Sequence, residues 1–231
     1  MGLLKIYDSG SKEQFKGDTN MFFDIDKQVN NNWVKISGRF KCFNEFFVNQ
    51  YEEEFCEIFL ESRRKSGVYD TCRVVIPINL IEEVGELREG DRLEIMGQIR
   101  SHNFLDDRCN SHLKVYVHAK KLSRLLNEAE DVNEVEVTGF LVKPATYRLT
   151  PLGREITDLL IAVNRSNGKS DYLPCIVWGI NAEYARTIDV GEQITLKSGR
   201  FQSRVYTKVY EYGYEKRTAF EISFGSIMKT I

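Results

Sequence analysis

The stretch D-Y-L-P-C-I-V-W-G at residues 171–179 is an apolar run with an aromatic residue near each end. After a short helical link and Gly191, a second apolar segment follows and ends G-R-F-Q-S-R-V-Y at residues 199–206. Short apolar runs bounded by turn residues are typical of buried strands. Aromatic rings beside Arg200 and Arg204 form a surface suited to a flexible anion with flat rings, such as a single-stranded nucleic acid.

Composition describes an ordinary soluble chain. The 231 residues are 42% hydrophobic and 29% charged, with a formal net charge of −2. This length predicts one or two domains. The sequence has no run of 18 apolar residues, and its first residues lack a signal peptide's apolar core, so we expect a cytoplasmic, nucleoid-associated protein. The near-neutral charge does not by itself indicate nucleic acid, but local stripes matter more than the total.

No pattern in the sequence predicts a metal, a cofactor or catalysis. The five cysteines are widely spaced, without a C-x-x-C pair, and the three histidines form no ligand pattern with them. We expect the cysteines to be mostly buried small hydrophobic residues in a reducing compartment. The phosphate-binding, metalloprotease and serine-hydrolase motifs are missing, so we expect no enzyme.

Strand-like patterns begin at Trp33 and recur through the first half of the chain. Five segments fit strands: residues 33–40, 55–62, 72–78, 92–100 and 113–119. Apolar residues at helical spacing predict a short helix over residues 79–87. We expect loops at residues 43–51 and 101–111, and a short helix or linker at residues 120–130.

The second half repeats this plan at a constant offset of 101 residues. The matched positions lie in four separate strands and their turns. In the first strand Val34, Ile36 and Gly38 match Val135, Val137 and Gly139, and in the turns Arg64, Gly67, Asp70 and Gly90 match Arg165, Gly168, Asp171 and Gly191. A constant offset over this length indicates duplication of one domain. Five short strands with a helix after the third are the order of an OB-fold, a small Greek-key barrel, so we expect an all-β chain of two tandem OB-folds.

Ordered blocks of the second half resemble the DNA-binding domain of the bacterial single-stranded DNA-binding protein (SSB) family. The blocks are N-E-V-E-V-T-G-F-L (133–141), T-Y-R-L-T-P-L-G-R-E-I-T (146–157), L-L-I-A-V-N-R (159–165), D-Y-L-P-C-I-V-W-G-I-N-A-E (171–183) and G-E-Q-I-T-L-K-S-G-R-F-Q-S-R-V-Y (191–206). The resemblance implies an N-terminal extension (1–31), a diverged OB-fold domain (32–126), a linker (127–132) and an SSB-like OB-fold domain (133–231), as in a tandem variant of the family.

The resemblance also implies partners. Most family members assemble four OB domains, so we expect a homodimer of this two-domain chain. The implied function is binding of single-stranded DNA in replication, recombination or repair, without sequence preference. Two departures are visible: Ser198 stands where the family has a glutamate, and we expect the family's acidic recruiting tail to be absent, because the chain stops at S-I-M-K-T-I.

We expect DNA to contact aromatic and cationic residues of the second domain. The resemblance carries stacking positions over to Tyr172, Trp178 and Tyr206, and Tyr147 is a further candidate. The hairpin at residues 206–220 adds Lys208, Tyr210, Tyr212, Tyr214, Lys216 and Arg217, and a phosphate track would use Arg148, Arg154, Arg165, Lys169, Arg200 and Arg204. Two alternatives stay open: Trp178 could face the core, and the tyrosines could form a cross-strand ladder or a dimer contact.

The first copy lacks much of this equipment. Thr71 and Pro77 stand opposite Tyr172 and Trp178, and the run Glu52–Glu54 stands opposite Gly153–Glu155. His102 and Phe104 correspond to Arg204 and Tyr206 after a one-residue shift, and Phe46 corresponds to Tyr147. We expect this copy to bind DNA weakly or along a different path. The competing hypothesis is a primosomal or recombination accessory factor in which OB-folds dock protein and bind little or no DNA.

Overall fold

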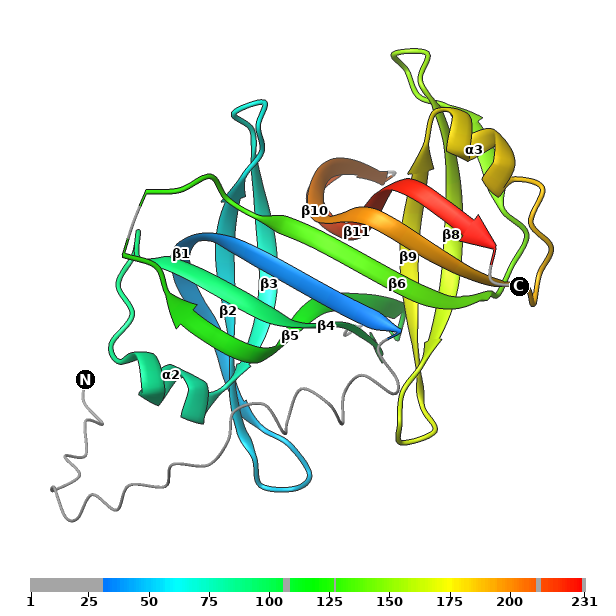
Figure 1. The fold of residues 1–231 in the computed structure, drawn as a ribbon. Coiled ribbons are helices and arrows are strands. Elements are labelled where there is room, and N and C mark those ends of the chain that lie inside the picture. The colour runs from blue at the N-terminus through cyan, green and yellow to red at the C-terminus, as the bar shows by residue number, and fades with distance from the viewer. Residues whose placement is uncertain (1–30, 106–108, 127, 211–212, 230–231) are drawn as a thin grey trace, which may run out of the picture. The chain divides into compact units, whose positions relative to one another are not determined.

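The computed structural model describes residues 31–105, 109–126, 128–210 and 213–229. Strands dominate these residues (Figure 1). The first half contains β1 (Asn32–Val48), β2 (Glu54–Arg63), β3 (Tyr69–Pro77), α2 (Ile78–Val84), β4 (Arg92–Leu105) and β5 (Ser111–Arg124). The second half contains β6 (Asn133–Leu141), β7 (Thr146–Leu149), β8 (Glu155–Asn164), β9 (Ser170–Trp178), α3 (Ile180–Ala185), β10 (Gln193–Tyr210) and β11 (Gly213–Lys229).

Each half closes into a five-stranded barrel with the OB-fold order. In the first, β1 pairs with both β2 and β4, while β3 joins β5 in parallel. In the second, β6 pairs with β8 and β10, β9 joins β11 in parallel, and β7 extends the hairpin with β8. The short helix lies after the third strand of each barrel, which confirms the predicted two tandem OB-folds.

The duplication extends to close packing inside each barrel. A Cβ on Gly38 would lie 2.3 Å from the carbonyl oxygen of Glu61, and a Cβ on Gly139 would lie 2.5 Å from that of Ala162. Both pairs of positions differ by the offset found in the sequence. Only glycine allows the first strand to cross the second this closely, so both copies need it at the same place.

The two barrels are joined by antiparallel pairing of β1 with β6 (Figure 1). The register places Val34 opposite Val135, with Asn32 opposite Val137 and Ile36 opposite Asn133. Val34 and Val135 are equivalent in the two copies, so the pairing has an approximate two-fold axis at this point. The buried apolar side chains of both barrels form one cluster.

The structure corrects three expected boundaries. Residues 43–48 continue β1 instead of forming a loop, and they pair with β2 as far as Val48 opposite Glu54. Two register shifts, at Phe40/Cys42 and Phe43/Glu45, break the alternation that would have marked this strand. The expected loop at residues 101–111 is shortened by β4 and β5, and β5 continues to Arg124 where a helix or linker was expected.

The helix predicted over residues 79–87 is Ile78–Val84. The expected N-terminal extension lies outside the described residues apart from Asn31. No helix in the described ranges is long and apolar enough to cross a membrane.

Candidate nucleic-acid interface

Strand β9 buries one side and presents the other. Leu173, Cys175 and Val177 are fully buried in the barrel. Tyr172, Pro174 and Trp178 occupy the alternating positions and therefore share the outer side. Tyr172 is 42% exposed, and Trp178 is partly exposed with its indole N–H donating to the Ser223 hydroxyl at 2.7 Å. The indole is thus held in one orientation without entering the core.

A shallow groove begins at Trp178 and runs along the hairpin of β7 and β8. Its lining residues are Leu149, Gly153, Arg154, Glu155, Trp178 and Gly179. Tyr147 lies on the same hairpin, where its hydroxyl donates to Glu155 at 2.9 Å and the Arg186 guanidinium lies 5.2 Å from its ring centre. This end of the face therefore combines aromatic surface with two cationic side chains.

Two further cations of the predicted track lie near this face. Arg148 forms an ion pair with Asp158 at 2.5 Å, with 43% of the arginine side chain exposed. Lys169 is exposed in the turn between β8 and β9.

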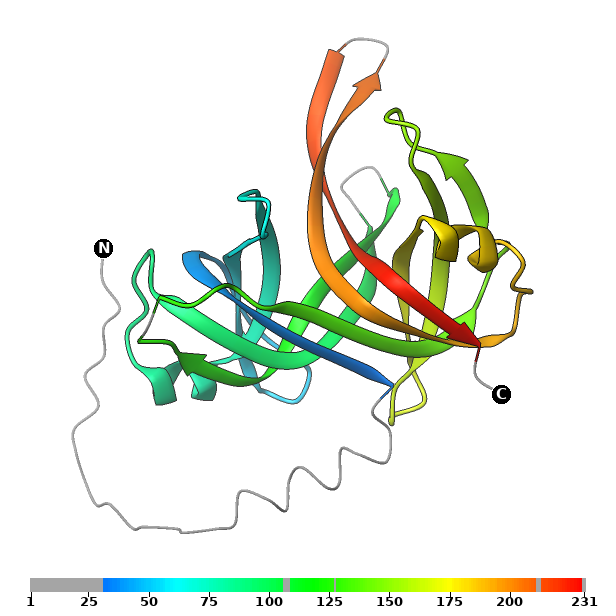
Figure 2. The ribbon, with the colours of Figure 1, turned by 45° about the horizontal axis from the view of Figure 1, so that its top comes forward.

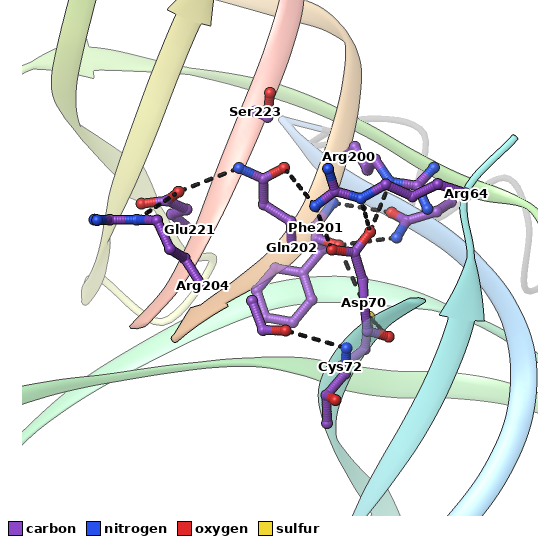
Figure 3. Close-up of polar contacts among 12 residues, drawn as sticks. Arg64, Asp70, Cys72, Arg200, Phe201, Gln202, Arg204, Glu221 and Ser223 are labelled. Atoms are coloured by element: carbon purple, nitrogen blue, oxygen red, sulfur yellow. Dashed lines mark hydrogen bonds and ion pairs between the residues drawn. The ribbon is translucent and has the colours of Figure 1, made fainter. Parts of the chain in front are cut away.

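The hairpin of β10 and β11 projects beyond its barrel and carries the second group of candidate residues (Figure 2). Tyr206 is 38% exposed and lies opposite Arg217 in the pairing. Arg204 places its guanidinium 5.9 Å from the Tyr206 ring centre and contacts Glu221 at 3.5 Å (Figure 3). Towards the tip, Tyr214 is 76% exposed, and Lys208 and Lys216 are also exposed. Tyr210 lies in β10, whereas Tyr212 is outside the described residues.

Arg165 and Arg200, also in the predicted track, are engaged between the barrels. Arg200 donates from Nε to Asp70 Oδ2 at 2.9 Å, across the interface (Figure 3). Asp70 is buried and also receives Arg64 of its own barrel at 2.9 Å. The positive charge of Arg200 is therefore balanced by a buried carboxylate.

The same arrangement recurs on the other side of the two-fold axis. Asp171 is fully buried and receives Arg165 of its own barrel at 2.8 Å and Arg100 of the first barrel at 2.9 Å. The hydrogen bond and charge of Asp171 raise the pKa of Arg165 above its ordinary value. Each barrel thus supplies one arginine to the buried aspartate of the other.

The equivalent face of the first barrel is built differently. A buried carboxylate, Glu57, contacts Lys114 at 2.6 Å and Arg73 at 3.4 Å, and accepts a hydrogen bond from Asn44 at 2.8 Å. Its counterpart by the offset is the half-exposed Asp158. The buried carboxylate of Glu57 therefore partly neutralises the positive charges of Lys114 and Arg73.

His118 is another change on this face. It lies beside Pro77 on the wall of a surface groove, and burial, with help from nearby cations, lowers its pKa to about 4. It is therefore neutral near pH 7 and adds no charge for a phosphate.

Residues 132–228 match the model of the Single-strand binding protein family. The match spans the second barrel. No curated protein sequence matches the chain significantly.

Among solved structures, the wild-type single-stranded DNA binding protein from Thermus aquaticus is 20% identical, with a TM-score of 0.68 over 87% of this chain and 93% of that one. A deletion variant of the same protein is 19% identical, with a TM-score of 0.69 over 87% of this chain and 94% of that one. At this identity the likeness shows the fold, and its coverage includes both barrels.

The sequence did not identify two basic residues that the fold brings beside the outer side of β9. Arg73 of β3 and Lys114 of β5 line a groove together with Pro174, Tyr206 and residues of β11. Arg73 corresponds by the offset to Pro174, an apolar outer position of β9. The sequence offset predicts this correspondence, but it does not predict that Arg73 and Pro174 line the same groove.

Proposed function

We propose that the chain binds single-stranded DNA without sequence preference. The observation that carries this proposal is the outer side of β9, which links the Trp178 groove to the β10–β11 hairpin. Trp178 and Arg154 line one groove, while Pro174 and Tyr206 line the next. Trp178 and Pro174 share one side of the strand, so an extended ligand can follow it from one groove to the other.

On this path, aromatic side chains would contact the bases and cationic side chains would contact the phosphates. The exposed faces of Tyr172, Trp178 and Tyr206 suit bases, and stacking is worth about 1–3 kcal/mol per base for any base. Arg148, Arg154, Lys169, Arg204, Lys208, Lys216 and Arg217 suit the phosphates, and Tyr147, Tyr210, Tyr212 and Tyr214 are further aromatic candidates. Arg165 and Arg200 stay candidates of lower rank, because buried aspartates already hold them.

The proposal is supported by the second barrel, which matches the model of a family named for single-strand binding, and by the fold that the chain shares with a single-stranded DNA binding protein from Thermus aquaticus. We place the activity in replication, recombination or repair, where single strands are exposed. We also propose that two chains associate, which would bring four barrels together. Mass measurement in solution tests that assembly: a monomeric mass at working concentration rejects it.

Titration of a labelled oligo-dT with the full chain tests the binding. We expect quenching of tyrosine and tryptophan emission and an affinity that falls steeply as salt rises, because counterions are released from the phosphates. Double-stranded competitor should have little effect, since paired bases offer no free faces. Failure to bind oligo-dT at low salt would reject the proposal and favour an OB-fold accessory factor that docks protein.

A further inference from the structure

A second groove lies between the two barrels, and both of them line it. The first barrel contributes Arg73, Phe104 and residues 111–115, and the second contributes Pro174, Tyr206 and residues 215–221. Two lining residues contact each other across the barrels: the Arg73 guanidinium lies 4.4 Å from the Phe220 ring centre. Residues 215–221 of the β10–β11 hairpin supply most of the second barrel's lining.

The two sides of this groove are related by the duplication. Arg73 and Pro174 are equivalent positions of the third strands, and both line the groove. Phe104 and Tyr206 are equivalent after the one-residue shift, and both line it too. The groove therefore lies near the approximate two-fold axis, where the long hairpins of both barrels meet.

Each hairpin presents an aromatic ring paired with a nitrogen-bearing side chain. Phe104 lies opposite His112 in the β4–β5 pairing, with the rings stacked at 5.5 Å between centres. Tyr206 lies opposite Arg217 in the β10–β11 pairing. Phe104 is 44% exposed and Tyr206 is 38% exposed, so part of each side chain is accessible to a ligand.

The charge of the lining residues favours a polyanion. Arg73, Lys114, Lys216 and Arg217 are cationic, whereas Glu215 and Glu221 are the carboxylates of the lining. Glu57 lies below Arg73 and Lys114 and is almost fully buried, so it fixes their positions more than it meets the ligand. The buried Nε of Arg73 lies 3.4 Å from Glu57 Oε1, and among the described residues it makes no hydrogen bond of regular geometry.

We propose that a single strand bound to the second barrel continues through this groove, with Phe104 and Tyr206 stacking on successive bases. Arg73, Lys114 and Lys216 contact its phosphates. The first barrel thus contributes to the DNA site through its β4–β5 hairpin, although Thr71 and Pro77 replace the aromatic residues of its own third strand. This inference rests on the proposed single-stranded DNA binding.

The experiment measures anisotropy of a labelled dT oligomer of roughly 30 nucleotides, longer than the ~4–16 that one OB-fold covers. Phe104→Ala in the full chain should weaken binding about tenfold, because one stacked base is worth about 1–3 kcal/mol. Tyr51→Ala is the matched control: it removes a 73% exposed ring from the first barrel outside the groove, and should change affinity less than twofold. Thermal unfolding of each variant establishes that it is folded.

Photocrosslinking of the wild-type chain to 5-iodouracil oligomers provides a second readout that needs no variant. We expect crosslinked peptides from residues 102–116 as well as from residues 206–220. Crosslinks confined to the second barrel, or Phe104→Ala affinity within twofold of wild type, would overturn the inference and leave the proposed function standing. A wild-type chain that fails to bind oligo-dT would overturn both.

Discussion

The two barrels share a frame and differ on the side that faces a ligand. In the second barrel, Trp178 ends β9 and donates to Ser223 of β11. In the first barrel, Pro77 ends β3, and the position equivalent to Ser223 is His118, as the matching parallel pairings of β3 with β5 and β9 with β11 show. The two copies therefore differ at both positions of this contact: the second barrel has an indole and a hydroxyl where the first has a proline and an imidazole.

The contacts between the barrels show the opposite behaviour. The buried aspartates Asp70 and Asp171 each hold an arginine of their own barrel and one of the other. Within its own barrel, each of the equivalent residues Asn32 and Asn133 also exchanges two hydrogen bonds with the backbone of the neighbouring strand, at Ile99 of β4 and Phe201 of β10. Packing between the barrels therefore restricts which residues can stand at these positions in both copies. The aromatic residues that would stack on a ligand are complete only in the second barrel.

The largest effect is expected when the buried carboxylates of Asp70 and Asp171, which are common to both barrels, are removed. Asp70→Asn and Asp171→Asn should each lower the free energy of unfolding by about 3–5 kcal/mol, because two arginines lose their buried partner. Denaturant unfolding measures both. Asp158→Asn, which breaks a half-exposed pair, should cost less than about 1 kcal/mol. A large loss for one aspartate and none for the other would break the equivalence of the two sides.

The stability of the first barrel should depend on pH through His118, whereas the equivalent residue of the second barrel, Ser223, does not titrate. Folding lowers the pKa of His118 from 6.5 to about 4 through burial. The unfolded chain therefore binds more protons between these values, and the stabilisation present above pH 6.5 is lost as pH falls through about 4. The loss should be on the order of 3 kcal/mol.

Unfolding of wild type and His118→Gln across this pH range measures that contribution. Wild type should lose stability relative to His118→Gln as the pH falls from 6.5 to about 4, and His112→Gln serves as a control on the same strand. Parallel stability curves for wild type and His118→Gln would contradict the assignment.

A matched pair of tyrosines, one in each barrel, tests whether the two barrels differ in DNA binding. Tyr206 and Tyr69 are both exposed, and each lies about 6 Å from an arginine guanidinium, at 5.9 Å and 6.0 Å. Tyr206→Ala should weaken oligo-dT binding by about 1–3 kcal/mol, whereas Tyr69→Ala on the first barrel should leave the dissociation constant within twofold. Equal losses would show that the first barrel binds as strongly as the second.

The smallest expected effect concerns the first hairpins, where Glu53 and Arg154 occupy equivalent positions. Arg154→Gln should weaken binding a few-fold and reduce the slope of log affinity against log salt by about 0.7, the value for one phosphate contact on a single strand. Glu53→Gln should leave that slope unchanged. A slope that responds to Glu53→Gln would place the DNA on the acidic hairpin as well.

Much of the frame was predictable because the copies differ in ligand residues but share turn and core residues. The offset that relates Gly38 to Gly139 and Asp70 to Asp171 runs through four predicted strands of each copy, and the structure has a strand at each of these places. The extension of β1 through Val48 escaped prediction because two bulges interrupt its alternation. A pattern of period two cannot be followed across a residue that has no partner.

The site was less predictable because a side chain's partner does not follow from its type. Arg165 and Arg200 have the charge and position of phosphate contacts, yet each lies against an aspartate, Asp171 or Asp70. For Arg200 that aspartate is 130 residues away in the chain. Glu57, equally, gives no sign in the sequence that it is buried beneath Arg73 and Lys114. Such contacts depend on how the barrels pair, which no local pattern encodes.

The pairing of β1 with β6 has a consequence for how this molecule can vary. When two identical chains meet about a two-fold axis, every substitution appears on both sides at once. Here one chain supplies both sides, so a residue can change in one barrel while its counterpart stays. The covalent link also makes the encounter of the barrels intramolecular, so dilution does not separate them. The protein therefore keeps the geometry of a symmetric pair while being free to specialise its halves.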